Sequence, residues 1–196
     1  VDDPEVDIVI ELIGGTTVAK ELVIRAIEAK KHVVTANKAL IAEFGTELFA
    51  LAAEAGVALR YEAAVAGGIP IIKALREGIA GNDIRWLAGI INGTTNFILT
   101  EMESAQRSFA DVLAQAQELG YAEADPTFDI EGIDAGHKLV ILAAIAFGMP
   151  LDIDGVYTEG MTSIAPADLV FARELGYRIK HLGIARLNEE GVNLRV

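Results

Sequence analysis

The sequence contains no cysteine, which excludes disulfide bonds and thiolate metal sites and fits a cytoplasmic enzyme. Basic residues are also scarce, because 16 Lys and Arg stand against 29 Asp and Glu and leave a net charge of -13. This balance disfavours nucleic acid and anionic membranes as partners, since both are negatively charged. The longest apolar run, LVILAAIAFGMPL, has about 13 residues, fewer than a membrane-spanning helix needs.

A Gly-rich phosphate-binding turn is missing as well, because G-x-G occurs nowhere in the chain. Such a turn normally opens a dinucleotide-binding fold. The chain also begins VDDPEVDIVI, without an initiator Met or a basic leader. Two interpretations stay open. Either the sheet binds no dinucleotide, or the chain is a fragment whose opening βαβ unit lies upstream, which the unusual start favours.

The first part of the sequence alternates short β-branched runs with segments of helical spacing. We expect strands at residues 6–13, 32–37 and 57–65, and helices at 16–31 and 38–56, the second closed by a glycine. Strands that are apolar on both faces and alternate with helices indicate a parallel sheet covered by helices. The fold class predicted for this part is α/β, half of a doubly wound sheet.

The pattern changes near residue 68, where we place a second, α+β domain (residues 68–196) after a first domain (residues 1–67). Ser108 and Asp111 resemble a capping box and predict that a long helical stretch restarts there. We expect the last strand to stop before its pairing is complete. The elements expected here are helices at 69–81, 97–120, 133–147 and 166–176, strands at 82–92 and 177–187, and a turn at 93–96.

Two candidate ligand contacts lie at the ends of the first two predicted strands. Gly14, Gly15 and Thr16 stand where the first strand meets a helix, which is where open α/β sheets bind ligands, or they form an ordinary capped turn. Lys38 follows the second strand directly, so it is either a surface lysine or a contact to a phosphate, ribose or carboxylate.

The acidic stretch at residues 123–134 holds five carboxylates and is followed by an almost entirely apolar helix. Asp134 and Lys138 lie one helical turn apart, and such pairs are usually solvated. Here the apolar helix must be nearly enclosed, so we expect the pair to line a cleft in which Lys138 can exchange a proton. The carboxylates then hold either an ammonium group or a metal, although calcium-loop spacing and a histidine ligand are both missing.

Residues 116–138, AQELGYAEADPTFDIEGIDAGHK, resemble the signature of the homoserine dehydrogenases. The resemblance extends through ELIGG, HVVTANKALIA, YEAAVAGGIPII, INGTTNFIL and ARELGYRIKHLGIA, and covers essentially the whole chain. It implies a partial Rossmann-like domain followed by a catalytic and dimerisation domain. The fixed positions of the signature are all filled, by Ala116, Gly120, Asp125, Pro126, Asp129, Gly132, Asp134 and Lys138.

The resemblance implies a homodimeric oxidoreductase that interconverts L-homoserine and L-aspartate 4-semialdehyde with NAD(P), in threonine, methionine and isoleucine biosynthesis. By similarity, Lys138 is the acid/base with Asp134 beside it, and Lys38 lies between cofactor and substrate. The implied substrate contacts are Glu123, Asp129, Tyr121, Gly93 and Thr94. The implied cofactor contacts are Gly14, Thr16, Lys38 and Gly120. A monovalent cation such as sodium is implied at Glu62, Val65, Gly67 and Ile69, mainly through backbone carbonyls.

Some parts of the family pattern are absent, including the residue that selects NAD or NADP at the ribose, so the cofactor preference stays open. Two competing hypotheses remain. The chain is a substrate-binding fragment that is inactive alone, or it belongs to another reductase with a similar nucleotide domain. An aspartate-semialdehyde dehydrogenase normally needs a catalytic cysteine, and a dihydrodipicolinate-type reductase should lack the pair Asp134 and Lys138.

Overall fold

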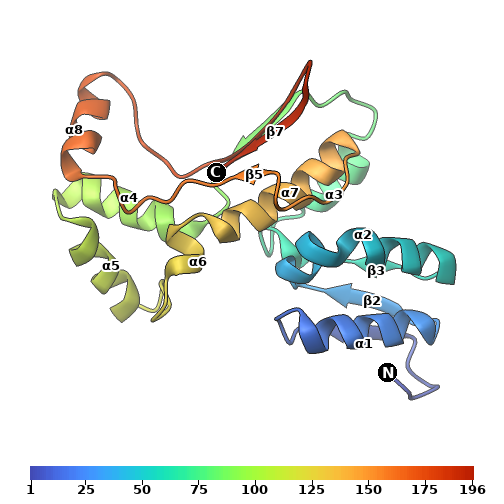
Figure 1. The fold of residues 1–196 in the computed structure, drawn as a ribbon. Helices are drawn as coiled ribbons and strands as arrows, with labels where there is room; N and C mark the ends of the chain where they lie inside the picture. Colours follow the sequence, from blue (N-terminus) through green and yellow to red (C-terminus); the bar gives the residue numbers. More distant parts are fainter. The chain divides into compact units, whose positions relative to one another are not determined.

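The structure is a computed structural model and describes residues 1–196. The chain folds into two units. The first comprises Val1–Arg85 and His137–Gly155, and the second Trp86–Gly136 and Val156–Val196. The helix α7 (Ile133–Phe147) begins in the second unit and continues in the first, and its bounds agree with the predicted helix. Figure 1 shows the course of the chain from blue to red.

The first unit is built on a parallel sheet with the strand order β1-β2-β3. The strands are β1 (Ile8–Glu11), β2 (His32–Thr35) and β3 (Leu59–Arg60), and the helices between them are α1 (Thr17–Glu28) and α2 (Lys38–Ala55). Gly56 ends α2 in a left-handed conformation with φ 71°. The predicted βαβαβ order and the parallel pairing are therefore confirmed.

One face of this sheet is covered and the other is bare. Glu11 and Val33 point to the covered face and are buried, and α1 contacts α2 as well as the strands. Alternate residues point the other way. On that face Ile8, Ile10 and Val34 are 54%, 64% and 39% exposed. The strands are thus apolar on both faces, as predicted, but only one apolar face is buried.

The third predicted strand, at residues 57–65, is shorter than expected. It ends after β3, and the chain turns into the 3-10 helix η1 (Glu62–Ala64). The Glu62 carboxylate explains the turn, because it accepts hydrogen bonds from the backbone N–H groups of Ile72 and Lys73 at 2.9 and 3.0 Å.

The helix predicted at residues 69–81 is only partly α-helical. It consists of α3 (Ile71–Lys73) followed by a π-helical turn, η2 (Ala74–Gly78). The π turn is closed by a hydrogen bond of 3.0 Å from the Ile79 N–H to the Ala74 carbonyl. Gly78 lies at its end, where glycine's low helix propensity favours termination.

The second unit places its helices largely where they were predicted. The stretch predicted at 97–120 forms α4 (Gly93–Ala105) and α5 (Phe109–Glu118), and the restart at Ser108 is confirmed. The turn predicted at 93–96 is instead the first turn of α4, because the Asn92 side chain caps the helix there. The Ser108 hydroxyl accepts from the Asp111 N–H and donates to the Asp111 carboxylate. The last helix, α8 (Pro166–Glu174), has Pro166 at its first position as expected.

A mixed sheet with the strand order β4-β6-β7-β5 completes this unit. Its strands are β4 (Trp86–Gly89), β5 (Val156–Tyr157), β6 (Gly183–Asn188) and β7 (Gly191–Arg195). β6 pairs antiparallel with β4 and β7, whereas β5 pairs parallel with β7. The expectation that the last strand's pairing is incomplete is wrong, because β7 pairs along its whole length with β6.

The strand predicted at 177–187 begins six residues late, at Gly183. The backbone of His181 explains the delay. Its carbonyl accepts from the Asn96 side-chain nitrogen at 2.9 Å, and its N–H donates to the Asn96 side-chain oxygen Oδ1 at 3.1 Å. The main chain there is bound to α4 and is not available to a neighbouring strand.

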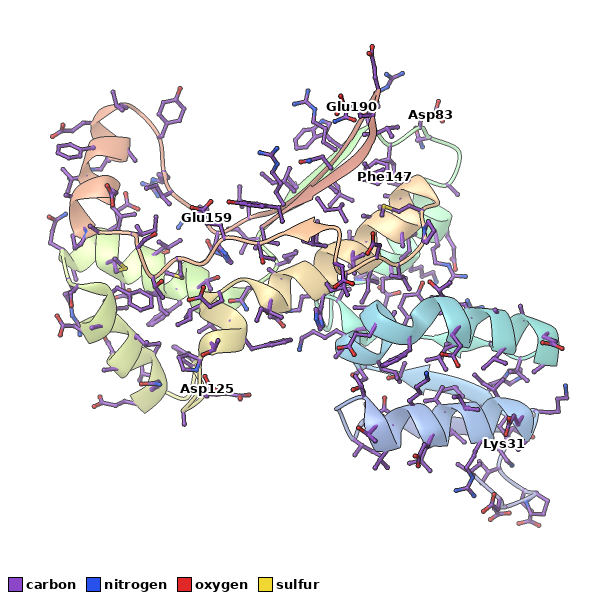
Figure 2. All side chains as sticks on the ribbon, in the orientation of Figure 1. Lys31, Asp83, Asp125, Phe147, Glu159 and Glu190 are labelled. Carbon is purple, nitrogen blue, oxygen red and sulfur yellow. The ribbon has the colours of Figure 1, made fainter.

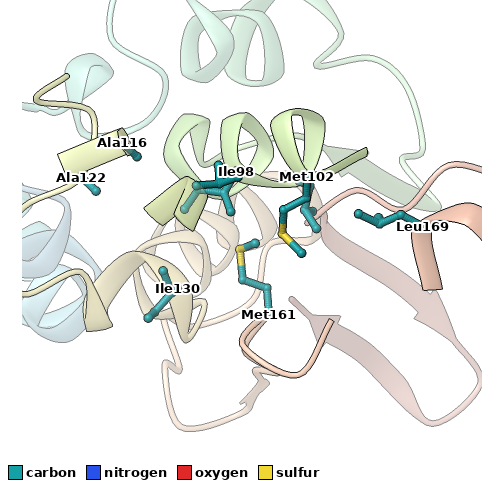
Figure 3. Close-up of a cluster of buried hydrophobic side chains, with 9 residues drawn as sticks. Ile98, Met102, Ala116, Ala122, Ile130, Met161 and Leu169 are labelled. Carbon is teal, nitrogen blue, oxygen red and sulfur yellow. The ribbon is translucent and has the colours of Figure 1, made fainter. Parts of the chain in front are cut away.

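A hydrophobic cluster joins the helices of the second unit (Figure 3). The short helix α6 (Thr127–Ile130), which was not predicted, contributes Ile130. Two methionines, Met102 and Met161, lie in the cluster, and unbranched side chains of this kind fill irregular gaps well. The buried members are Ile98, Leu99, Met102, Val112, Ala116, Ala122, Ile130, Met161 and Leu169.

Met102→Ala is expected to lower the free energy of unfolding by about 2–5 kcal/mol, because Met102 is fully buried and its removal leaves a cavity. Urea unfolding followed by circular dichroism measures the change. Leu175→Ala is the matched control, since Leu175 is 74% exposed and should change stability by less than about 0.5 kcal/mol. Equal effects of the two substitutions would contradict the assignment of the core.

Candidate functional site

A buried glutamate organises the carboxyl ends of β1 and β2. Glu11 is only 3% exposed. One carboxylate oxygen accepts from the N–H groups of Ile13 and Gly14 at 2.8 and 3.1 Å, and the other accepts from the Thr35 hydroxyl at 2.5 Å. A buried carboxylate needs such donors to offset the loss of water. Glu11 therefore holds the turn after β1 to the end of β2.

The contacts continue from Thr35 to the start of α2. The Thr35 hydroxyl oxygen accepts from the Asn37 N–H at 2.9 Å. Asn37 caps α2 by accepting from the Leu40 N–H at 3.1 Å, and its amide donates to the Gly15 carbonyl at 2.6 Å. Lys38, the first residue of α2, is half-buried at this position. The predicted residues Gly14 and Lys38 thus lie on segments that one hydrogen-bonded network connects.

The turn before α1 is formed by two glycines and is open. Gly14 and Gly15 have φ of 79° and 70°, in the left-handed region that favours glycine, and a Cβ on either would meet no atom within 4 Å. The N-cap of α1 is Thr16, one of two neighbouring threonines suited to that position, but its side chain makes no capping hydrogen bond. The open turn at a helix N-terminus fits an anionic or polar ligand such as a dinucleotide.

The N-terminus of α4 gathers polar groups of the acidic stretch in the second unit. Asn92 is the N-cap, and its amide nitrogen donates to Asp129 at 2.7 Å and to Asp134 at 2.9 Å. Asp134 is buried, and Asp129 is half-buried. A positive helix end is a favourable place for carboxylates. The structure therefore brings together two of the predicted site carboxylates.

Two further predicted residues meet at the same helix end. The Thr94 hydroxyl donates to the Tyr121 carbonyl at 2.9 Å. The Tyr121 ring packs edge-on against Phe97 of α4, with ring centroids 5.0 Å apart, although more than half of Tyr121 remains exposed. Gly93 is the first residue of α4 and is itself exposed. The substrate residues predicted at Gly93, Thr94, Tyr121 and Asp129 therefore cluster around one helix N-terminus.

The rest of the acidic stretch is more open. Glu123 has an exposed side chain, and its carbonyl accepts from the Gln117 amide at 3.1 Å. Gly120 lies just after α5 with φ 74°. Figure 2 shows Asp125 on the segment between α5 and α6. Hydrogen bonds from the Thr127 hydroxyl and backbone N–H hold the pKa of Asp125 below its ordinary value. Asp125 of the signature thus helps to start α6.

The pair Asp134 and Lys138 lies on successive turns of α7. Asp134 is 4% exposed and Lys138 is half-buried, so this is not a solvated surface pair. His137 between them is also buried. The enclosed pair has the environment in which a lysine can serve as an acid or base.

The loop predicted to hold a monovalent cation is sharply bent. Ala66 and Gly68 have φ of 49° and 83°. Among the predicted ligands, Val65 is buried, whereas Gly67 and Ile69 are exposed. The structure contains no group of three or more His, Cys, Asp or Glu side chains suited to a metal. Backbone carbonyls of this loop are the donor type that a hard monovalent cation accepts.

A cavity of about 570 Å³ in the first unit contains none of the predicted site residues. Phe49, Tyr61, Arg76 and Ile145 are among its lining residues. Burial raises the pKa of the Tyr61 hydroxyl, and the opposing charges of Arg76 and Arg60 do not cancel that effect. The predicted residues lie instead in the two polar networks, around Glu11 and around Asn92.

Sequence reasoning missed the residues that hold the predicted ones in place, namely Glu11, Thr35, Asn37, Asn92 and Asn96. One signal was present, because a glutamate inside an apolar strand is unusual. A second was Asn37, which directly precedes a predicted helix and is a good N-cap. Neither signal names the partners of these side chains.

Comparison with known proteins decides the family. A family model described as "Homoserine dehydrogenase, NAD binding domain" matches residues 1–62, and one described as "Homoserine dehydrogenase" matches residues 70–196. The chain belongs to the homoserine dehydrogenase family. The family assignment and the α/β fold class are therefore confirmed, together with a nicotinamide-type nucleotide-binding domain.

Relatives in this family are similar along the whole chain. The homoserine dehydrogenase of Pseudomonas aeruginosa is 66% identical over 99% of this chain, and that of Bacillus subtilis is 47% identical over all of it. A crystal structure of a homoserine dehydrogenase from Thiobacillus denitrificans is 65% identical over the whole chain, with a TM-score of 0.98. This chain spans about 45% of the length of each of these proteins.

None of the helices combines the length and the apolar character that a membrane crossing demands.

Glu11→Ala is expected to lower the free energy of unfolding by about 1–3 kcal/mol, because it removes the acceptor for three hydrogen bonds. Glu11→Gln keeps the size of the side chain and one carbonyl oxygen, so its loss should be smaller. Glu21→Ala, an exposed change on α1, is the control and should alter stability by less than about 0.5 kcal/mol. Chemical unfolding at constant pH compares the three variants. If Glu11→Ala and Glu21→Ala have the same free energy of unfolding, Glu11 does not organise the strand ends.

Proposed function

We propose that the protein containing this chain is a homoserine dehydrogenase that interconverts L-homoserine and L-aspartate 4-semialdehyde in threonine, methionine and isoleucine biosynthesis. The observation that supports this most is the site at the start of α4. There Asn92 holds Asp129 and Asp134 together, and Lys138 follows Asp134 by one turn of α7. The family membership of the chain names the reaction for which these groups are suited.

The carboxylates of the acidic stretch bind the amino group of the substrate in this proposal. Asp129 and Glu123 are the side chains assigned to that role, since a carboxylate pairs well with an ammonium group. Tyr121, Gly93 and Thr94 form the surrounding surface. Several fixed contacts restrict the substrate to one orientation, which lowers the entropic part of the barrier.

Lys138 moves the proton of the reaction. During reduction of the aldehyde it donates a proton to the carbonyl oxygen, and during oxidation of homoserine it removes the hydroxyl proton. The carboxylate of Asp134 lies one turn of α7 before the lysine, and Lys138 is half-buried.

Gly14, Thr16, Lys38 and Gly120 are the residues that would contact NAD(P), which supplies a hydride acceptor or donor when bound. The open turn at Gly14 and Gly15 allows close approach of the ligand to the backbone. Lys38 offers a positive charge at the start of α2. The bent loop with Glu62, Val65, Gly67 and Ile69 is proposed to hold a monovalent cation such as sodium.

Lys138→Ala should lower kcat for homoserine oxidation in the intact protein by at least about 100-fold, because the acid/base is lost. Lys138→Arg should be equally impaired, since arginine keeps the charge but cannot give up its proton. Stopped-flow or steady-state assays that follow NAD(P)H absorbance measure the rates. Lys30→Ala, at an exposed lysine after α1, is the control with normal turnover. Normal turnover of the Ala variant at 138 would exclude the assigned role.

We also propose a homodimer that forms through the exposed face of the second sheet. Trp86 pairs with Arg186 across β4 and β6, and Tyr157 pairs with Arg195 across β5 and β7. Trp86 and Tyr157 are 64% and 61% exposed. A two-fold interface brings a surface onto its own copy, and aromatic rings and guanidinium groups complement each other in that arrangement.

Trp86→Asp is expected to weaken dimerisation by at least about 10-fold, because it replaces a large aromatic surface with a charge. Sedimentation velocity over a micromolar dilution series measures the dissociation constant. Tyr177→Asp is the matched control, since Tyr177 is 72% exposed but lies outside the sheet. An unchanged dissociation constant for the variant at Trp86 would exclude this face.

A further inference from the structure

We propose that Asn92 is a positioning residue of the reaction, which fixes Asp129 and Asp134 relative to each other through its amide group. This inference rests on the proposed function, in which Asp129 contacts the substrate and Asp134 accompanies Lys138. Asn92 itself does not touch the reacting atoms in this assignment. Its effect passes through the two carboxylates.

The geometry of the Asn92 amide supports a shared role. The residue is 4% exposed, and one nitrogen donates to an oxygen of Asp129 at 2.7 Å and to an oxygen of Asp134 at 2.9 Å. Two carboxylate oxygens bound to one nitrogen are at most two hydrogen-bond lengths apart. At that range like charges repel strongly unless a donor lies between them.

The orientation of the amide is determined by its other end. The Asn92 side-chain oxygen accepts from the Thr95 N–H at 2.9 Å and is 3.0 Å from the Thr95 hydroxyl oxygen, which donates to it. With the oxygen directed to the first turn of α4, the nitrogen must face the carboxylates. The helix cap therefore sets the direction of the two donors.

The main chain of Asn92 is held as well. The Asn96 amide donates to the Asn92 carbonyl at 3.0 Å and to the His181 carbonyl at 2.9 Å. Both ends of the Asn92 residue are thus fixed within the second unit. A group that is held at its backbone and at its side-chain oxygen can place an N–H with little freedom.

The choice of amino acid separates positioning from helix capping. Ser and Asp cap helices about as well as Asn. Neither offers the two amide hydrogens that two carboxylates require. The same use of an asparagine occurs at α2, where Asn37 caps the helix and its amide donates to the Gly15 carbonyl. At α4, however, both acceptors are carboxylates of the candidate site.

Two variants of the intact protein test the inference. Asn92→Asp has the same shape and keeps the cap, but it puts a third carboxylate where the donors were. Asn92→Ser keeps a capping oxygen and adds no charge. It is the variant to assay if Asn92→Asp does not fold. Asn82→Ser, at an exposed asparagine, is the control. Thermal unfolding of every variant shows whether the fold is retained.

The kinetic readout is kcat and KM for homoserine at saturating NAD(P). We expect Asn92→Asp to lower kcat/KM by at least about 100-fold. KM should rise because Asp129 is displaced, and kcat should fall because Asp134 is displaced. Asn92→Ser should lose about 10-fold or more. In the double variant Asn92→Ser with Asp129→Asn, the rise in KM should be no larger than that of the worse single variant within about 3-fold, because Asn92 affects KM through its contact with Asp129.

The outcomes distinguish this inference from the proposed function. If the wild-type protein oxidises homoserine and both Asn92 variants stay within about 3-fold of its kcat/KM, the positioning role is wrong. Increases in KM that multiply in the double variant would also overturn it. If the wild-type protein does not oxidise homoserine, the proposed function fails. The contact between Asn92 and Asp129 is then tested by the unfolding midpoints of the two single variants and the double variant. If the shifts of Asn92→Ser and Asp129→Asn add in the double variant, the contact is rejected. If the double variant shifts no more than the worse single variant, the contact is supported.

Discussion

A carboxylate that leaves water must be given hydrogen-bond donors, and both units of this chain depend on meeting that requirement. Glu11 meets it in the first unit with two backbone N–H groups and the Thr35 hydroxyl. Asp134 meets it in the second with the Asn92 amide. In each case one donor comes from a segment distant in sequence, so satisfying one buried charge also joins two segments.

Helix N-termini provide the second half of this arrangement. Asn37 and Asn92 each use the side-chain oxygen to cap a helix and the nitrogen to bind a neighbouring segment. A cap alone contributes about 1 kcal/mol to stability. The additional bond makes the start of α2 or α4 a fixed reference for the residues that surround it. Lys38 and Gly93, the first residues of these helices, are positioned by the same contacts.

The predictable part of the structure is the part that depends on local sequence. The order of strands and helices in the first unit, the glycine that ends α2 and the restart of a helix at Ser108 all follow from periodicity and capping chemistry. The signature also identified Asp129, Asp134 and Lys138 as candidates. The hydrogen bonds from Asn92 to Asp129 and Asp134 span 37 and 42 residues, and no periodic pattern in the sequence indicates such distant partners. The errors have the same origin, because Glu62 and Asn96 redirect the backbone through long-range side-chain bonds that outweigh the strand propensity around them.

The bond between Asn96 and His181 joins residues 85 positions apart. Contacts of such long sequence separation carry a large loop-closure cost and tend to form late in folding. The start of α4 thus receives its final support only after the segment before β6 has docked. The geometry of the candidate site is consequently a property of the completed second unit and not of the acidic stretch itself. A local opening that releases residues 181–196 will loosen Asn92 and its two carboxylates together, while the helices around Met102 can remain packed.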